Sequence, residues 1–189
     1  MTDKELDALR QRAWAMLKPS RIEHVRGVEE TAAHLAQKYG ADEETCRVAA
    51  MLHDCTKRLS LSEQLEICRK YGVDVDEMER ESPELLHSKS GAAVAKYEFG
   101  ASDEVIEAIK WHTTGKANMS LTEKIVCLAD FIEPSRHFEG VEAVRREAER
   151  DLDGALILAF SRTLKHLEEK GVEPHRNTRQ ALEFLLARR

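Results

Sequence analysis

The chain has 189 residues, of which 42% are hydrophobic and 34% are charged, and its formal net charge is −6. A chain of this length and composition is typical of one soluble globular domain that buries its own core. The acidic balance and the lack of a long basic run argue against a nucleic-acid polymer as partner, and no apolar stretch approaches the length of a membrane span.

The cysteine content bears on where the protein works. The four cysteines, Cys46, Cys55, Cys68 and Cys127, form no Cys-x-x-Cys pair. Residues 1–17 are amphipathic and rich in charged residues, and they lack the apolar centre of a signal peptide. We therefore expect a cytoplasmic protein with buried or half-buried thiols, because disulfides are rare in that compartment.

Helix signals recur along the chain, and strand signals are nearly absent. A serine three residues before a glutamate, as at Ser60/Glu63 and Ser120/Glu123, is typical of the capping box that begins a helix. Pro19 is expected to end the first helix. We predict an all-α fold, a bundle of eight to nine helices. The predicted helices lie near residues 3–17, 21–39, 43–56, 61–71, 83–99, 103–112, 121–132, 140–170 (in one piece or broken near Asp151) and 178–188.

Six residues with metal-binding side chains recur through these helices in the order His, His-Asp, His, His, Asp. An adjacent His-Asp pair carries little information alone, so the number and order of the six matter more. Six such side chains are enough for a binuclear metal centre in which the two ions share a bridging carboxylate. The predicted metal ligands are His24, His53, Asp54, His87, His112 and Asp130.

Several of these side chains border the apolar face of a predicted helix. His53 follows Ala49 by one helical turn, Asp54 lies about 100° further round the helix, and Asp130 is one turn after Val126. A half-buried aspartate is costly unless it is paired or ligated. A single histidine near an apolar face is more often a hydrogen-bonded core histidine than a metal ligand. The remaining histidines, for which we expect ordinary surface or half-buried positions, are His34, His137, His166 and His175.

At this point the chain resembles the HD superfamily of metal-dependent phosphohydrolases. Within it, the chain is most similar to the YqeK family of symmetrical diadenosine tetraphosphate hydrolases. The segments 111–115 and 128–136 are the most specific matches, because the wider superfamily needs only the histidines and aspartates. A departure from the family pattern at Cys55-Thr56 leaves the ligands intact. The matching segments are residues 21–28, 52–57, 87–88, 111–115 and 128–136.

The resemblance implies how the ligands are shared. His24, His53, Asp54 and Asp130 would hold one metal ion, and Asp54, His87 and His112 would hold the second. The resemblance implies iron, whereas the ligand types alone allow Fe, Mn, Co or Zn. The implied reaction is attack of a metal-bridging hydroxide on an inner phosphorus of diadenosine tetraphosphate, which yields two ADP.

Cationic and hydrogen-bonding residues near the ligands are candidates for substrate contacts. Lys57 and Arg136 are the candidate catalytic residues, because an ammonium group can steady phosphate oxygens and a guanidinium can clamp two of them. Lys57 and Arg58 could instead simply suit a helix C-terminus. Glu133 is expected to orient Arg136. The candidate substrate-binding residues are Lys57, Thr113, Thr114, Gly115, Arg136 and Arg26, the last of which could instead only hold an acidic neighbour.

Other functions stay open at this stage. They are another HD phosphohydrolase (a nucleotidase or a guanosine polyphosphate hydrolase), an HD-type di-iron oxygenase, and a nucleotide-sensing module without turnover. We predict that the protein binds a small-molecule dinucleoside polyphosphate and that it binds neither a nucleic-acid polymer nor a membrane. A homodimer is the assembly to test. We predict a single HD domain over 1–189, with a metal-binding core at about 20–136. The C-terminal helices at 140–188 would only pack on this core or would also wall a nucleoside pocket.

Overall fold

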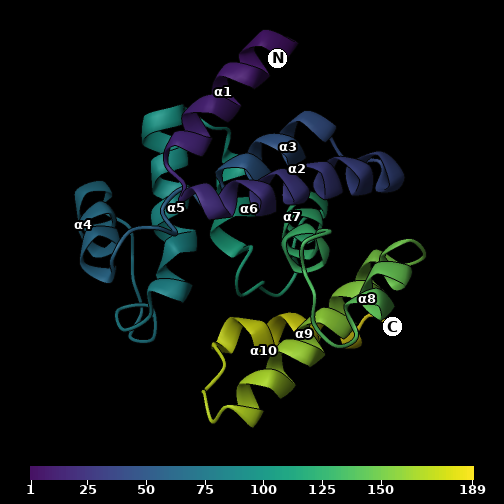
Figure 1. The fold of residues 1–189 in the computed structure, drawn as a ribbon. Coiled ribbons are helices and arrows are strands. Elements are labelled where there is room, and N and C mark those ends of the chain that lie inside the picture. Colours follow the sequence, from purple (N-terminus) through teal and green to yellow (C-terminus); the bar gives the residue numbers. More distant parts are fainter.

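The computed structural model describes residues 1–189, apart from the side chain of residue 3. All regular structure in this part of the chain is helical, which confirms the predicted all-α fold (Figure 1). None of the described helices combines the length and apolar character needed to cross a membrane. The helices are α1 (Asp3–Ala15), α2 (Pro19–Tyr39), α3 (Glu43–Leu52), α4 (Leu61–Tyr71), α5 (Pro83–Phe99), α6 (Asp103–Trp111), α7 (Leu121–Ile132), α8 (Val141–Ala148), α9 (Leu152–Glu169) and α10 (Arg176–Leu186).

Three details differ from the sequence prediction. The described chain has ten helices instead of eight to nine, because the segment over 140–170 takes the second of its two predicted forms and is broken near Asp151, whose backbone is extended (φ −151°, ψ 108°). Pro19 begins α2 instead of ending α1, since a proline in the first turn of a helix loses no hydrogen bond. Helix α3 ends at Leu52, four residues early, and the chain continues in tight turns whose amides bond three residues back.

Local sequence signals account for most helix ends. Ser60 and Ser120 both form complete capping boxes with the glutamates three residues later, as predicted. Gly72 and Gly100 end α4 and α5 in the left-handed conformation, with φ values of 65° and 66°. Glycine adopts this conformation at little cost, so these helices stop where the sequence places a glycine.

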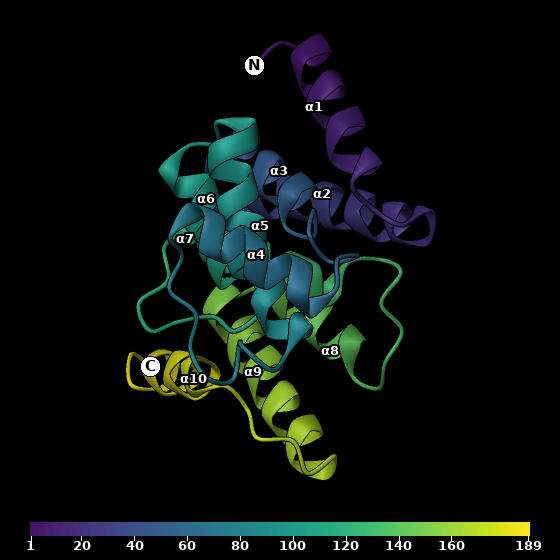
Figure 2. The same cartoon turned by 90° about the vertical axis from the view of Figure 1, so that its left-hand side faces the viewer.

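The core positions α7 at the centre of the molecule. Helices α2, α3 and α6 pack against it, and α8–α10 lie together on one side of it (Figures 1 and 2). One apolar cluster joins α2, α7 and α9 through buried residues such as Leu35, Leu128 and Leu156. A second joins α3, α5, α6 and α7 through Leu52 and other buried residues. Helix α7 is therefore held on two faces, which fixes the direction of the side chains in its last turn.

Candidate metal centre

All six predicted ligands converge at one place between helices α2, α3, α5, α6 and α7. Three of the side chains lie within helices, two histidines cap the C-terminal ends of α3 and α6, and Asp54 directly follows the first of these caps. Because each helix is fixed by the core, each side chain enters the centre from a different direction. The ligands come from α2 (His24), the end of α3 (His53 and Asp54), α5 (His87), the end of α6 (His112) and α7 (Asp130).

The carboxylate of Asp54 lies in the middle of the group. Its Oδ1 is 3.2 Å from His87 Nε2, and its Oδ2 is 3.3 Å from His53 Nε2 and 3.7 Å from His24 Nε2. On the other side, Asp130 Oδ1 lies 3.1 Å from His24 Nε2 and 3.9 Å from His53 Nε2. Asp54 is thus the one carboxylate among these ligands that reaches histidines on both sides, as a bridging ligand must.

Ligand atoms fall into two overlapping groups. Atoms from His24, His53 and Asp130 lie within 4.8 Å of one another, and so do atoms from His53, Asp54 and His112. Three buried atoms of these residues have no hydrogen-bond partner, namely Nε2 of His24, Nε2 of His53 and Oδ1 of Asp54. Buried polar atoms are rarely left without a partner, and all three are good donors to a divalent transition metal. The residues present therefore fit a metal centre.

Backbone carbonyl groups orient three of the histidines. In His53, His87 and His112, Nδ1 lies 2.6, 2.7 and 2.7 Å from the carbonyl oxygen of the residue three positions earlier. Since a carbonyl can only accept, each Nδ1 carries a proton, and in the neutral ring Nε2 is then the atom with a lone pair for a metal. The Nε2 atoms of His87 and His112 are 3.0 Å apart, so their lone pairs face each other. A bound cation would stabilise that arrangement.

Burial and charge set the protonation states that metal binding requires. Burial, strengthened by the nearby His87 and His53, lowers the pKa of His112 to about 3. Burial favours the neutral form of Asp54, but His53 and His87 outweigh it and hold the pKa of that carboxyl well below its usual range. For Asp130, burial is likewise outweighed by His24 and His53, and its pKa is also held low. At neutral pH the centre therefore offers carboxylates and a neutral His112.

Glu133 has a closer partner than the one expected. Its Oε1 accepts a hydrogen bond from His24 Nδ1 at 2.9 Å, whereas Arg136 Nε lies 3.8 Å away from it. Ser135 holds the carboxylate through its amide and hydroxyl groups at 2.7 and 2.5 Å. Gly27 leaves the space that this requires, because a Cβ there would come within 2.6 Å of Glu133 Oε2. Glu133 therefore orients the imidazole of His24, a predicted metal ligand.

The Glu133→Gln variant is expected to bind metal about tenfold more weakly than the natural protein. The isosteric amide removes the negative charge that favours Nδ1–H on His24, and loss of such a partner costs about 10- to 100-fold in metal affinity. Competition with a chelator of known affinity measures the effect. Glu139→Gln is the matched control, since Glu139 is exposed and lies outside the ligand group. Equal affinity in both variants would contradict this role.

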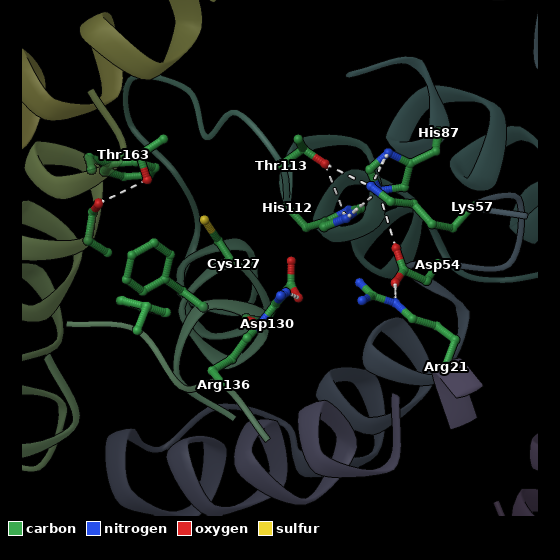
Figure 3. A pocket seen from close by; sticks show the side chains of 14 residues that line it. Arg21, Asp54, Lys57, His87, His112, Thr113, Cys127, Asp130, Arg136 and Thr163 are labelled. Atoms are coloured by element: carbon green, nitrogen blue, oxygen red, sulfur yellow. Dashed lines mark hydrogen bonds and ion pairs between the residues drawn. The ribbon is translucent and has the colours of Figure 1, made fainter. Parts of the chain in front are cut away.

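A cavity of about 370 Å³ opens beside the ligands (Figure 3). Its polar end carries three cationic side chains, Arg21, Lys57 and Arg136. Arg21 Nε donates to Asp54 Oδ2 and Arg136 Nη2 donates to Asp130 Oδ1, each at 2.6 Å. In Figure 3, Thr163 lies across the cavity from Lys57, at the end where phenylalanine side chains line it.

Arg21 is a lining residue that the sequence analysis did not select. It lies three residues before His24 on α2, so the two side chains share one face of that helix. That spacing was a usable signal, and it favoured Arg21 over Arg26, which is two residues after His24. Arg26 is exposed and does not line the cavity.

The loop after α6 brings one of its three candidates to the cavity. Thr113 lines it, with Oγ1 3.2 Å from His112 Nε2. Thr114 is buried and donates instead to the carbonyl oxygen of Gly115 at 2.9 Å. The amide of Gly115, expected to meet phosphate, donates to Trp111 O at 2.8 Å. Thr114 and Gly115 therefore serve the conformation of the loop.

One histidine expected at the surface or half-buried is instead buried and has a defined partner. His175 is buried, caps the start of α10, and its Nε2 lies 2.7 Å from Asp76 Oδ2. This pair ties α10 to the loop before α5 and lies outside the ligand group.

Comparison with known proteins places this site in a family. Residues 21–135, which include all six predicted ligands, match the HD domain family. The chain is 42% identical over 166 residues to the symmetrical bis(5'-nucleosyl)-tetraphosphatase of Halalkalibacterium halodurans, which covers 85% of this chain and 88% of that protein. It is 37% identical to the protein of the same name from Bacillus subtilis, over 85% of this chain and 89% of that one.

A solved structure is similar over nearly the whole length. It is a predicted HD superfamily hydrolase involved in NAD metabolism from Clostridium acetobutylicum, with a TM-score of 0.92 and 40% identity, and the match covers 97% of each chain. Together with the six converging ligands, these matches show that the chain belongs to the HD-domain hydrolases, in the family of the symmetrical bis(5'-nucleosyl)-tetraphosphatases.

Proposed function

We propose that this protein is a metal-dependent hydrolase that cleaves diadenosine tetraphosphate symmetrically into two molecules of ADP. The observation that carries the proposal is the convergence of metal-binding and cationic side chains on one cavity. An anionic polyphosphate needs both, because metal ions and guanidinium groups neutralise charge on the attacked phosphoryl group. Relatives that carry the name of this activity match most of the chain.

The HD domain and the His/Asp groups imply a divalent metal centre. We propose that it is binuclear, with His24, His53, Asp54 and Asp130 around one ion. The second ion would be held by Asp54, His87 and His112. Iron is our first candidate, and Mn, Co or Zn would suit the same imidazole and carboxylate ligands. When bound, the metal supplies Lewis acidity and lowers the pKa of water to near neutrality.

The chain's own residues would position the phosphates. Arg136 and Arg21 present planar guanidinium groups at the cavity, and each is already held by a ligand carboxylate. Lys57 lines the same cavity but forms no ion pair among the described residues, and burial lowers the pKa of its ammonium group. A half-buried ammonium without a carboxylate partner is unfavourable, so a phosphate oxygen would be a good partner. Thr113 would donate a further hydrogen bond.

The Lys57→Gln variant is expected to lose about 10- to 100-fold in kcat/KM for diadenosine tetraphosphate, with metal content unchanged. A hydrogen bond to a charged group contributes about 1.5–3 kcal/mol, and each 1.4 kcal/mol is a factor of ten. Arg58→Gln is the matched control, because Arg58 is the next residue and is exposed. An equal loss in both variants would contradict a specific contact of Lys57. It would show that the positive charge at this end of the helix is sufficient.

Steady-state assays on protein loaded with each candidate metal test the function. The substrates are diadenosine tetraphosphate, a guanosine polyphosphate and AMP, and an oxygen electrode follows any oxygenase reaction. We expect the highest kcat/KM for diadenosine tetraphosphate and no oxygen uptake. A preference for another substrate, oxygen consumption, or tight nucleotide binding without products would overturn the proposal in favour of the corresponding class.

The organisation of the chain completes the proposal. We propose a single HD domain over 1–189, with its metal-binding core at about 20–136 and the helices of 140–188 packed on that core. Cytoplasmic location and a homodimer stay predictions, which cell fractionation and light scattering test.

A further inference from the structure

A second hollow of about 470 Å³ lies along α9, next to the cavity of the metal centre. The two spaces share three lining residues, Phe131, Phe138 and Thr163. We call the two phenylalanines, together with Thr163 beside them, the aromatic wall. Phe131 directly follows the ligand Asp130 in α7. The hollow therefore begins within one residue of the metal centre, which is close enough for one molecule to occupy both spaces.

The two phenylalanines of the aromatic wall form a paired platform. Their ring centroids are 5.1 Å apart and the rings are inclined by 74°, an edge-to-face arrangement. Phe138 lies between α7 and α8 and is 39% exposed, whereas Phe160 in the neighbouring cavity is 4% exposed. An edge-to-face pair at a cavity rim leaves a ring face for stacking. A flat aromatic ligand is the occupant that such a face suits best.

A cationic side chain stands beside this platform. Arg162 on α9 lines the hollow, is half-buried, and forms no ion pair among the described residues. Its guanidinium lies against Gly140, where a Cβ would collide with it, so a glycine at this position permits its placement. The hollow thus offers an aromatic face and an unpaired cation, which together fit a nucleobase attached to an anionic group.

We propose that this hollow binds one nucleoside of the dinucleoside substrate, with its base stacked on Phe138 and with Arg162 beside the ribose or the nearest phosphate. The inference rests on the proposed function, since it assigns the other end of the same substrate. The polar end of the cavity takes the phosphate chain and the aromatic wall takes the base. Helix α9 then walls a nucleoside pocket in addition to packing on the core.

The test compares Phe138→Leu with Phe138→Tyr in the metal-loaded protein. Leucine keeps an apolar side chain but removes the ring, whereas tyrosine keeps the ring. Loss of stacking on one base corresponds to about a tenfold higher KM for diadenosine tetraphosphate, with kcat changed less than about twofold. Phe138→Tyr is expected to keep the natural KM. So is Phe184→Leu, the matched control on α10, whose side chain lines neither space.

A binding measurement separates failure of this inference from failure of the proposed function. Diadenosine tetraphosphate is titrated into Asp54→Ala protein, which we expect to be inactive, with and without Phe138→Leu. We expect the dissociation constant to rise about tenfold with Phe138→Leu. Unchanged KM and unchanged binding in Phe138→Leu would overturn the nucleoside site even if the natural protein releases ADP. If Phe138→Leu weakens binding but the natural, metal-loaded protein releases no ADP, the nucleoside site stands and the proposed function is overturned.

Discussion

Replacing Asp54 with alanine is expected to abolish both metal binding and hydrolysis of diadenosine tetraphosphate while the helices remain folded. Asp54 is the carboxylate that approaches histidines on both sides of the centre, at 3.3 Å from His53 and 3.2 Å from His87. In the proposed binuclear centre, neither ion would keep its full ligand set without Asp54, and the activation of water that the metal would supply would be lost. We expect turnover to fall by at least about 1000-fold, beyond the loss from a single oriented hydrogen-bond donor.

Three measurements on the same Asp54→Ala preparation check this result. Elemental analysis gives the metal content, a product assay gives turnover, and circular dichroism gives the helix content. Asp76→Asn is the matched control, because it removes another aspartate paired with a histidine, His175, at a place outside the centre. An Asp54→Ala protein that keeps two metal ions per chain and natural turnover would refute the bridging role.

Removing the metal from the natural protein is expected to lower its melting temperature by about 10 °C and to stop hydrolysis. A ligand that binds only the folded state at 1,000 times its Kd stabilises that state by about 4 kcal/mol. In a chain of this size, each kcal/mol shifts the melting temperature by about 2–4 °C. The buried Nε2 atoms of His24 and His53 have no hydrogen-bond partner, so they are left without any partner when the metal is removed.

Calorimetry before and after chelation measures this shift, and adding back Fe, Mn, Co or Zn should restore both stability and activity. The Asp54→Ala protein is the control, since a chelator should not change its melting temperature. Protein that elemental analysis finds free of metal, yet melts and turns over as before, would rule out a metal-dependent mechanism.

Much of the fold and of the ligand set could be predicted from the sequence because the relevant signals are local. Ser60 and Ser120 begin helices through contacts within a single turn, and those contacts form as expected. His53 and Asp54 are adjacent at the end of one helix, so their divergent directions follow from helix geometry. The order of the six side chains along the chain predicted a shared metal centre, and the structure brings these side chains together.

The remainder depended on contacts between distant segments. Glu133 meets His24 across 109 residues of sequence, and no local pattern indicates that pairing. The amide of Gly115 was expected at the substrate, but the turn at the end of α6 uses it for Trp111 O. The two spaces that meet at Phe138 exist because α9 packs against α7, a tertiary arrangement that helix periodicity leaves undetermined.

Chromatography of the products from diadenosine tetraphosphate, using protein of known metal content, tests the central claim most directly. Attack at an inner phosphorus with release of ADP leaves a second ADP, so the account predicts ADP as the sole product. ATP together with AMP would contradict the symmetrical position of the attack, and no product from metal-loaded protein would contradict the proposed activity itself.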